Sequence, residues 1–169
     1  MNKGGLSTVV TTVIMIALVV AAIAIIWAFV DQLIKTNTEK SKSCSNIYGK
    51  ITINNRYTCY NSTSKEFMFS VKIGDIDIDE LLVSISGDMN SKSFKLDNNG
   101  ISIAALKNTT GSSIVKLPGK NGGSTYIYNM TEGGFSGKPD SIELAPIINK
   151  NQCEISDSLS EIDDCSLLV

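Results

Sequence analysis

The residues that could perform covalent or metal chemistry are few in this chain. Its 169 residues include no histidine and four cysteines, Cys44, Cys59, Cys153 and Cys165. The lack of histidine removes the commonest general base and the commonest metal ligand, and it excludes a Ser-His-Asp triad. Zinc sites usually take cysteines in close pairs such as C-x2-C, which this sequence lacks. An even number of widely spaced cysteines instead predicts disulfides formed in an oxidising compartment.

The pairing of the cysteines is open at this level, because four cysteines allow three connectivities. We expect neighbours in the sequence to pair, Cys44 with Cys59 and Cys153 with Cys165, since each pair encloses a compact polar stretch. Four buried free thiols are the alternative to disulfides.

Two short stretches resemble functional motifs but miss the required pattern. The run Asp75–Glu80 alternates aspartate with isoleucine, whereas a calcium loop needs small polar residues between its ligands and a glycine at its sixth position. We expect a strand there, with the aspartates on its solvent face. The run Gly133–Lys138 misses the spacing of both the phosphate-binding loop and the nucleophile elbow, so we expect a surface loop. We therefore expect no catalytic residue, no cofactor and no metal site, and a protein that is not an enzyme.

Three N-x-S/T sequons are candidate N-glycosylation sites, at Asn61, Asn108 and Asn129. Such triplets also arise by chance in a chain rich in Asn, Ser and Thr. All three lie in the part of the chain that we expect outside the membrane. Asn129 is the weakest candidate, because we expect it inside a strand.

The first secondary-structure element that the sequence predicts is a long apolar segment near the N-terminus. Leu6–Val30 is a run of 25 residues without a charged side chain, and Lys3 is the single charge before Asp31. As a helix the run is about 37 Å long, which exceeds the roughly 30 Å of a bilayer's hydrocarbon core. Residues 31–35 can extend the helix, and the polar residues 36–45 predict a linker or a fraying helix end. Under the positive-inside rule, Lys3 predicts a cytoplasmic N-terminus and an external remainder.

From Ile47 onward, apolar residues alternate with polar ones. Phe67–Ile73 is the clearest run, and Leu81–Ile85 and Ser141–Ile148 repeat the pattern. A period of two with one apolar face is typical of half-buried antiparallel strands. The Asn-Gly pair at residues 99–100 predicts a hairpin between the strands on either side of it. The sequence therefore predicts an α+β chain: a long N-terminal hydrophobic helix followed by an all-β antiparallel sandwich.

The charge balance argues against nucleic acid as a partner. Residues 31–169 carry 14 basic and 17 acidic side chains, which gives this part a net charge of −3. A nucleic-acid-binding surface would need a basic face. The roughly 140 residues after the apolar run are enough for one hydrophobic core.

The first 35 residues resemble the class III signal and helix of archaeal type IV pilins and archaellins. The matching residues are Lys3, Gly4, Gly5 and Leu6, followed by Ser7 and the uninterrupted apolar run. In that family a prepilin peptidase cuts after a glycine that follows a basic residue, immediately before the helix. The bonds after Gly4 and after Gly5 both fit, and we favour the second, because the mature chain would then begin with leucine.

The resemblance implies a leader at 1–5, a transmembrane and filament-core helix with its linker at 6–43, and an extracellular β-sandwich, archaellin-like in architecture, at 44–169. The implied function is that of a structural subunit of an archaeal type IV pilus-like surface filament. The helix would first anchor the precursor in membrane lipid and then pack against copies of itself. The prepilin peptidase and the pilus assembly machinery are the further implied partners. Small side chains would permit close helix approach at Ala17, Ala21, Ala22, Ala24 and Ala28.

Two departures from the family pattern affect the choice among its members. Many type IV pilins carry a glutamate at the fifth mature position, where this chain has Val9 or Val10. Archaellins also lack that glutamate, but they usually show glycines early in the helix, and this helix has none after Gly5. We therefore favour an adhesion-type pilin, with an archaellin as one alternative. The other is a single-pass, membrane-anchored extracellular binding protein that does not polymerise.

Overall fold

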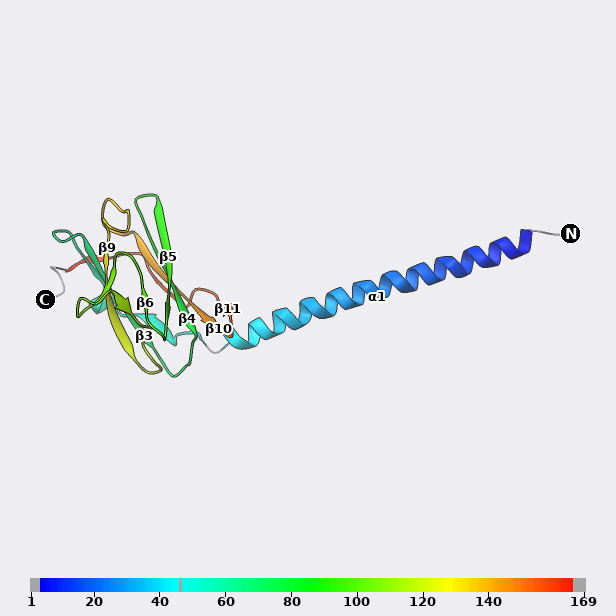
Figure 1. The fold of residues 1–169 in the computed structure, drawn as a ribbon, viewed down its shortest axis with the longest axis horizontal. Coiled ribbons are helices and arrows are strands. Elements are labelled where there is room, and N and C mark those ends of the chain that lie inside the picture. The colour runs from blue at the N-terminus through cyan, green and yellow to red at the C-terminus, as the bar shows by residue number, and fades with distance from the viewer. Residues whose placement is uncertain (1–3, 46, 166–169) are drawn as a thin grey trace. The chain divides into compact units, whose positions relative to one another are not determined.

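The first element is one long helix. A computed structural model describes residues 4–45 and 47–165, and in it α1 spans Gly4–Cys44, 41 residues. Figure 1 shows α1 as an uninterrupted helix. The chain divides into two compact units, the helix up to Ser41 and a β-rich domain that begins at Lys42.

The helix extends farther than a linker at residues 36–45 would allow. Those polar residues are helical up to Cys44, so the linker alternative is wrong. The reason is visible in the composition, because no glycine or proline occurs between Gly5 and Gly49, and lysine and glutamate are good helix formers. An ion pair one turn apart, between Lys35 Nζ and Asp31 Oδ2 at 2.8 Å, also joins the polar end of the helix to its apolar part.

The β-rich domain contains two main sheets and a small ribbon. The larger sheet has the strand order β13-β2-β3-β9-β7, with β1 also paired to β3. All its pairs are antiparallel except β13 with β2, which is parallel. Its strands are β1 (Ile51–Ile53), β2 (Cys59–Asn61), β3 (Glu66–Ile73), β7 (Leu106–Asn108), β9 (Gly123–Asn129) and β13 (Asp163–Asp164).

The smaller main sheet has the order β11-β10-β4-β5, with β12 also paired to β10, and it is antiparallel throughout. The third sheet is a ribbon of β6 with β8, and a 3-10 turn, η1, joins β1 to β2. The bounds of these elements are β4 (Glu80–Gly87), β5 (Asn90–Asp97), β6 (Ile101–Ser102), β8 (Ile114–Val115), β10 (Ser141–Ile148), β11 (Asn151–Gln152), β12 (Asp157–Leu159) and η1 (Asn55–Tyr57).

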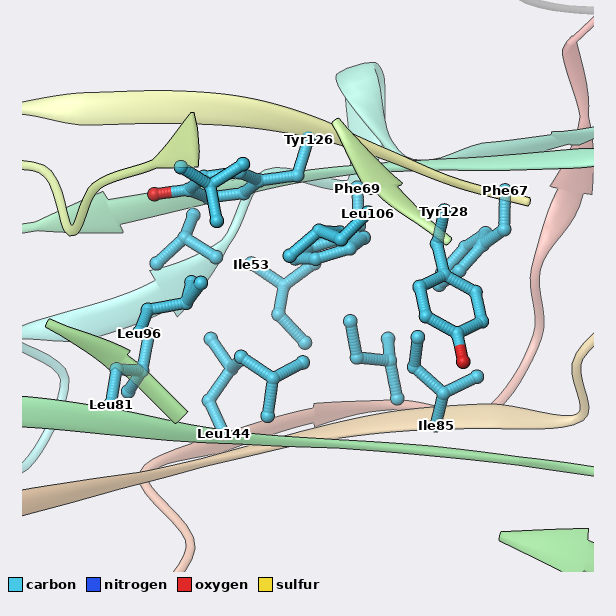
Figure 2. Packing of buried hydrophobic residues seen from close by; sticks show 14 of the residues in the cluster. Ile53, Phe67, Phe69, Leu81, Ile85, Leu96, Leu106, Tyr126, Tyr128 and Leu144 are labelled. Atoms are coloured by element: carbon cyan, nitrogen blue, oxygen red, sulfur yellow. The ribbon is translucent and has the colours of Figure 1, made fainter. Parts of the chain in front are cut away.

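The core lies between the two main sheets, as Figure 2 shows. The alternation predicted for Phe67–Ile73 and Leu81–Ile85 is confirmed, because Phe67, Phe69 and Val71 are fully buried, as are Leu81 and Ile85. Aromatic rings dominate the larger sheet's contribution, and the rings of Phe69 and Tyr126 have centroids 5.3 Å apart. The α+β architecture, one apolar helix followed by antiparallel sheets, is thus the observed fold.

The predicted hairpin at residues 99–100 is wrong. β5 pairs with β4 through the register Glu80↔Asp97, and β6 pairs with β8. A type I′ hairpin turn needs positive φ at both central residues, and of this pair Gly100 alone has it, at φ 90. The Asp97 carboxylate accepts hydrogen bonds from the backbone N–H groups of Asn99 and Gly100, at 3.0 and 2.9 Å. These bonds close a local turn that leads the chain away from β5.

The expected strand at residues 75–80 is also wrong over most of its length. Residues 75–78 form a loop, and β4 begins at Glu80. The backbone N–H of Ile76 bonds within the loop, to the carbonyl of Gly74 at 2.8 Å. Ile78 is nevertheless buried, so the alternation reflects a loop that anchors one isoleucine in the core.

Candidate functional site

The apolar part of α1 is long enough to cross a membrane. The segment Val9–Lys35, 27 residues, is long enough and apolar enough to span a membrane, and none of it is buried within the chain. At 1.5 Å per residue it measures about 40 Å, against roughly 30 Å of hydrocarbon. Every large apolar side chain from Val9 to Ile34 is exposed, from 36% at Val30 to 71% at Ile25. An all-round apolar helix must be covered by lipid or by protein.

Four of the five alanines singled out from the sequence share one face of this helix. Ala17, Ala21, Ala24 and Ala28 are all helical, and their spacing of four, three and four residues keeps them within an arc of about 60° at about 100° per residue. Ala22, at about 140° from Ala17, lies off that face. A second helix can therefore approach most closely along the line of the four alanines.

The residues of the expected cleavage site fall at the start of the same helix. Gly4, Gly5 and Leu6 lie in the first turn of α1, whereas Lys3 lies outside the described residues. Cleavage after either glycine stays a prediction.

The four cysteines form two disulfides, but not those expected between sequence neighbours. Cys44 bonds Cys153 and Cys59 bonds Cys165, over sequence separations of 109 and 106. The Cα atoms of the two pairs are 5.5 and 4.9 Å apart. The expected pairing of Cys44 with Cys59 and of Cys153 with Cys165 is therefore wrong, as is the alternative of free thiols.

Strand pairing explains why the distant cysteines meet. β13 lies parallel to β2 with Asp163 opposite Cys59 and Asp164 opposite Tyr60, so the next residue, Cys165, comes beside β2. Cys153 directly follows β11, and its backbone N–H bonds the carbonyl of Pro146 in β10 at 2.9 Å. The first disulfide thus ties the last residue of α1 to the smaller sheet, and the second ties the C-terminal segment to the larger sheet.

The three sequon asparagines occupy equivalent places, each the last residue of a strand. Asn61 ends β2, Asn108 ends β7 and Asn129 ends β9 rather than lying inside it. Each side-chain oxygen accepts a backbone N–H two or three residues on, from Thr63 at 2.9 Å and Thr110 at 3.0 Å, for example. The oxygen holds these turns, and the amide nitrogen is the atom that glycosylation would modify. Asn61 is exposed, while Asn108 and Asn129 are half-buried.

A lysine balances part of the negative charge of the acidic loop after β3. Lys120 Nζ lies 2.9 Å from Asp75 Oδ1 and 3.9 Å from Asp77 Oδ2. The hydrogen bond and charge of Lys120 lower the pKa of Asp75, and Asp75 raises the pKa of the lysine in return. Across residues 4–45 and 47–165, no cluster of three or more His, Cys, Asp or Glu side chains could hold a metal ion.

Family models, curated proteins and solved structures gave no significant match to this chain. What the chain itself carries is a membrane-length apolar helix followed by a disulfide-bonded β domain. Disulfides form and persist in oxidising, external compartments. Together the two features indicate a membrane-anchored or secreted extracellular protein.

The loop at 131–138 is on the surface, as expected, but the sequence did not reveal how it is held. Phe135 is buried and packs edge-on against Tyr128, with ring centroids 6.4 Å apart. Ser136 Oγ donates to Asp88 Oδ2 at 2.8 Å, at the tip of the β4–β5 hairpin. The sequence feature that could have indicated this contact is Phe135 itself, a single aromatic residue among glycines.

Proposed function

We propose that the protein is a structural subunit of an archaeal type IV pilus-like filament, with α1 as the filament core and the β domain as the outer coat. The observation that carries the proposal is a helix whose large apolar side chains are exposed from Val9 to Ile34, in an apolar run that directly follows Lys3, Gly4 and Gly5 in the sequence. The processing site resembles that of archaeal pilins, whose leader is removed on the near side of the helix, so the helix stays on the mature protein.

The energetics support burial of α1 against copies of itself once it leaves lipid. Burying one large apolar side chain is worth about 1.5–3 kcal/mol. For the apolar side chains between Val9 and Ile34, the sum is on the order of tens of kcal/mol. Water would not replace the apolar surroundings that the helix loses when it is extracted from the membrane. A bundle of identical helices would replace them. The face of Ala17, Ala21, Ala24 and Ala28 gives that bundle a line of close approach.

The test replaces alanines on that face with a larger apolar residue. Ala21→Leu together with Ala24→Leu keeps the helix apolar, so membrane insertion should be unchanged. Overpacking a close interface costs about 1–3 kcal/mol per site, and the defect recurs in every subunit of a filament. We expect few or no surface filaments by electron microscopy on cells that make the variant.

Ala22→Leu is the matched control, because the same substitution lies off the alanine face. It should insert and assemble like the wild type. A non-polymerising anchored binding protein needs only length and hydrophobicity from its helix. Cells with abundant mature wild-type protein and no filaments would therefore decide for the anchored binding protein, and so would normal assembly of the double leucine variant.

A further inference from the structure

The strand order gives the β domain two opposite sides that differ in charge. On one side lie β5 and β7, the edge strands of the two main sheets. They share that side because Phe94 of β5 stacks on Tyr128, with centroids 5.7 Å apart, and Tyr128 pairs with Leu106 of β7. On the other side lie β12 and β13. There the two sheets are joined by a hydrogen bond from the backbone N–H of Ile53 in β1 to Asp157 Oδ2, at 2.7 Å.

The side with β5 and β7 carries four exposed lysines, which we call the lysine edge: Lys92 and Lys95 in β5, Lys107 in β7, and Lys116 directly after β8. Lys95 is balanced by Glu80, whose Oε2 lies 2.8 Å from its Nζ. Within residues 4–45 and 47–165, the other three form no ion pair. Lys116 lies beside the end of β5, because the backbone N–H of Leu117 bonds the Asp97 carbonyl at 2.8 Å. Asp97, half-buried at the end of β5, accepts hydrogen bonds from the backbone N–H groups of Asn99 and Gly100. With Lys95 balanced, the lysine edge still presents net positive charge.

The opposite side carries the acidic edge, which consists of Glu154, Asp157, Glu161, Asp163 and Asp164. Residues 151–165 contain these five acids and no basic residue. Glu154, Glu161 and Asp163 are exposed, and no ion pair forms on any of the five in the described part of the chain. Four basic residues border this side: Arg56 between β1 and β2, Lys138 across a groove from Glu161, and Lys50 and Lys150 directly before β1 and β11. The five carboxylates outnumber them.

The free backbone edge of β5 does not favour pairing with a strand of another chain. Lys92 is opposite Ile85 in the register, so it occupies a core-facing position of the sheet. An inward-facing charge on an edge strand blocks edge-to-edge sheet extension. What the lysine edge offers a partner is therefore charge and not backbone hydrogen bonds.

We infer that the lysine edge of one β domain contacts the acidic edge of a second copy of this chain. Within one copy the two edges cannot meet, because β13 and β7 are separated by the three strands β2, β3 and β9. Four strand spacings of about 4.8 Å place them about 19 Å apart. A contact between two different surfaces of identical subunits is heterologous, and it propagates into an open helical array unless the rotation closes a ring.

This inference rests on the proposed function for its setting, since a filament brings many copies side by side. The electrostatic contact deepens that proposal by naming what orients one β domain against the next. Exposed charges interact over a Debye length of about 10 Å at 0.1 M salt. We therefore expect the contact to weaken as salt rises.

The first experiment detects the contact whether or not filaments form. Membranes and surface fractions holding equal amounts of full-length isotope-labelled and unlabelled protein are treated with a carbodiimide, which joins lysine to carboxylate without a spacer. Mass spectrometry should find mixed-label cross-links from Lys92, Lys107 or Lys116 to Glu161, Asp163 or Asp164. Raising salt to 1 M before cross-linking should reduce their yield several-fold.

The second experiment reverses the charges. Lys92→Glu, Lys107→Glu and Lys116→Glu together should lower filament number at least tenfold, as should Glu161→Lys, Asp163→Lys and Asp164→Lys. Mixing the two variants in one cell should restore contacts, because the reversed lysine edge of the first variant is opposite in charge to the reversed acidic edge of the second. The matched control reverses the same number of exposed lysines outside the lysine edge, at Lys50, Lys72 and Lys150. It adds no negative charge to the lysine edge and should assemble normally.

The outcomes separate this inference from the filament proposal. Cross-links between copies without filaments would support the contact and refute the pilin function. Filaments without these cross-links, and with normal assembly of both reversed variants, would overturn the contact and leave the filament standing. Absence of both filaments and cross-links would reject the two together.

Discussion

Removing one disulfide should expose how the two bonds depend on each other. The perturbation is the pair Cys44→Ala and Cys153→Ala, compared with the pair Cys59→Ala and Cys165→Ala. Either pair removes one cross-link from the β domain, whose core residues such as Phe69 and Leu81 stay untouched. The quantity measured is the free energy of unfolding of that domain.

The magnitude follows from the length of chain that each bond closes in the unfolded state. A single bond spanning 109 or 106 residues restricts the unfolded chain by about 4.8 kcal/mol. With the other bond present, the closed loop shrinks to the 15 residues from Cys44 to Cys59 plus the 12 from Cys153 to Cys165. Such a loop of about 27 residues is worth about 3.6 kcal/mol. The first bond removed should therefore cost about 3.6 kcal/mol and the second about 4.8 kcal/mol.

The assay is urea unfolding of the full-length protein in detergent, without reductant. All five tyrosines lie after residue 47 while Trp27 lies in α1, so near-UV circular dichroism of tyrosine reports on the β domain. The quadruple variant should lose more than the sum of the two double variants, by about 1 kcal/mol. If sequence neighbours paired instead, each double variant would take one cysteine from both bonds. Each would then lose about 6 kcal/mol and the quadruple variant about the same, and that pattern would refute the long-range pairing.

Replacing the pair Gly4–Gly5 with valines should block processing, so mass spectrometry should find the leader intact where the wild type begins at residue 5 or 6. Burial raises the pKa of Tyr126 to about 12 from 10.0. The folded state therefore holds a proton that the unfolded state loses between pH 10 and 12, and stability should fall by roughly 3 kcal/mol across that window. Denaturation of Tyr126→Phe should show a shallower slope, and the part that remains comes from Tyr128, whose pKa burial also raises. Peptide mass spectrometry should find glycan on Asn61 and Asn108 but not on Asn129, which adjoins the buried Met130.

The local structure was largely predictable because it depends on side-chain period. Phe67, Phe69 and Val71 alternate with polar residues over one face, and such a run has few folded conformations other than a half-buried strand. The apolar run from Leu6 to Val30 similarly has few alternatives to a helix. Both elements are observed where the pattern placed them.

The connections were less predictable because they depend on which strands pair. The Asn-Gly signal at 99–100 was overridden by Asp97, which bonds the backbone of that very turn. The real hairpin between β4 and β5 turns at Asp88 and Met89, both at positive φ, 49 and 62. Methionine is rare in this conformation, so the sequence gives no reason to expect a turn there.

The cysteine pairing and the charged edges share this dependence on topology. Cys165 reaches Cys59 because a two-residue strand lies parallel to β2, and nothing local to either cysteine signals that pairing. Lys92 and Lys107 come from different sheets, and they share a side because of the strand order alone. The sequence shows that residues 151–165 are acidic. It does not show that the lysine edge lies on the opposite side of the β domain.

The bond between Cys44 and Cys153 has a mechanical consequence for a chain whose two ends are held by different neighbours. Tension along α1 reaches the β domain by two covalent routes: through the backbone into β1 of the larger sheet, and through the disulfide to the residue after β11 of the smaller sheet. Force is then divided between both halves of the sandwich. Pulling on the helix cannot peel β1 away from β3 until the smaller sheet has also yielded. Reduction of this one bond would return the whole pull to three residues of β1 and convert a shared load into unzipping.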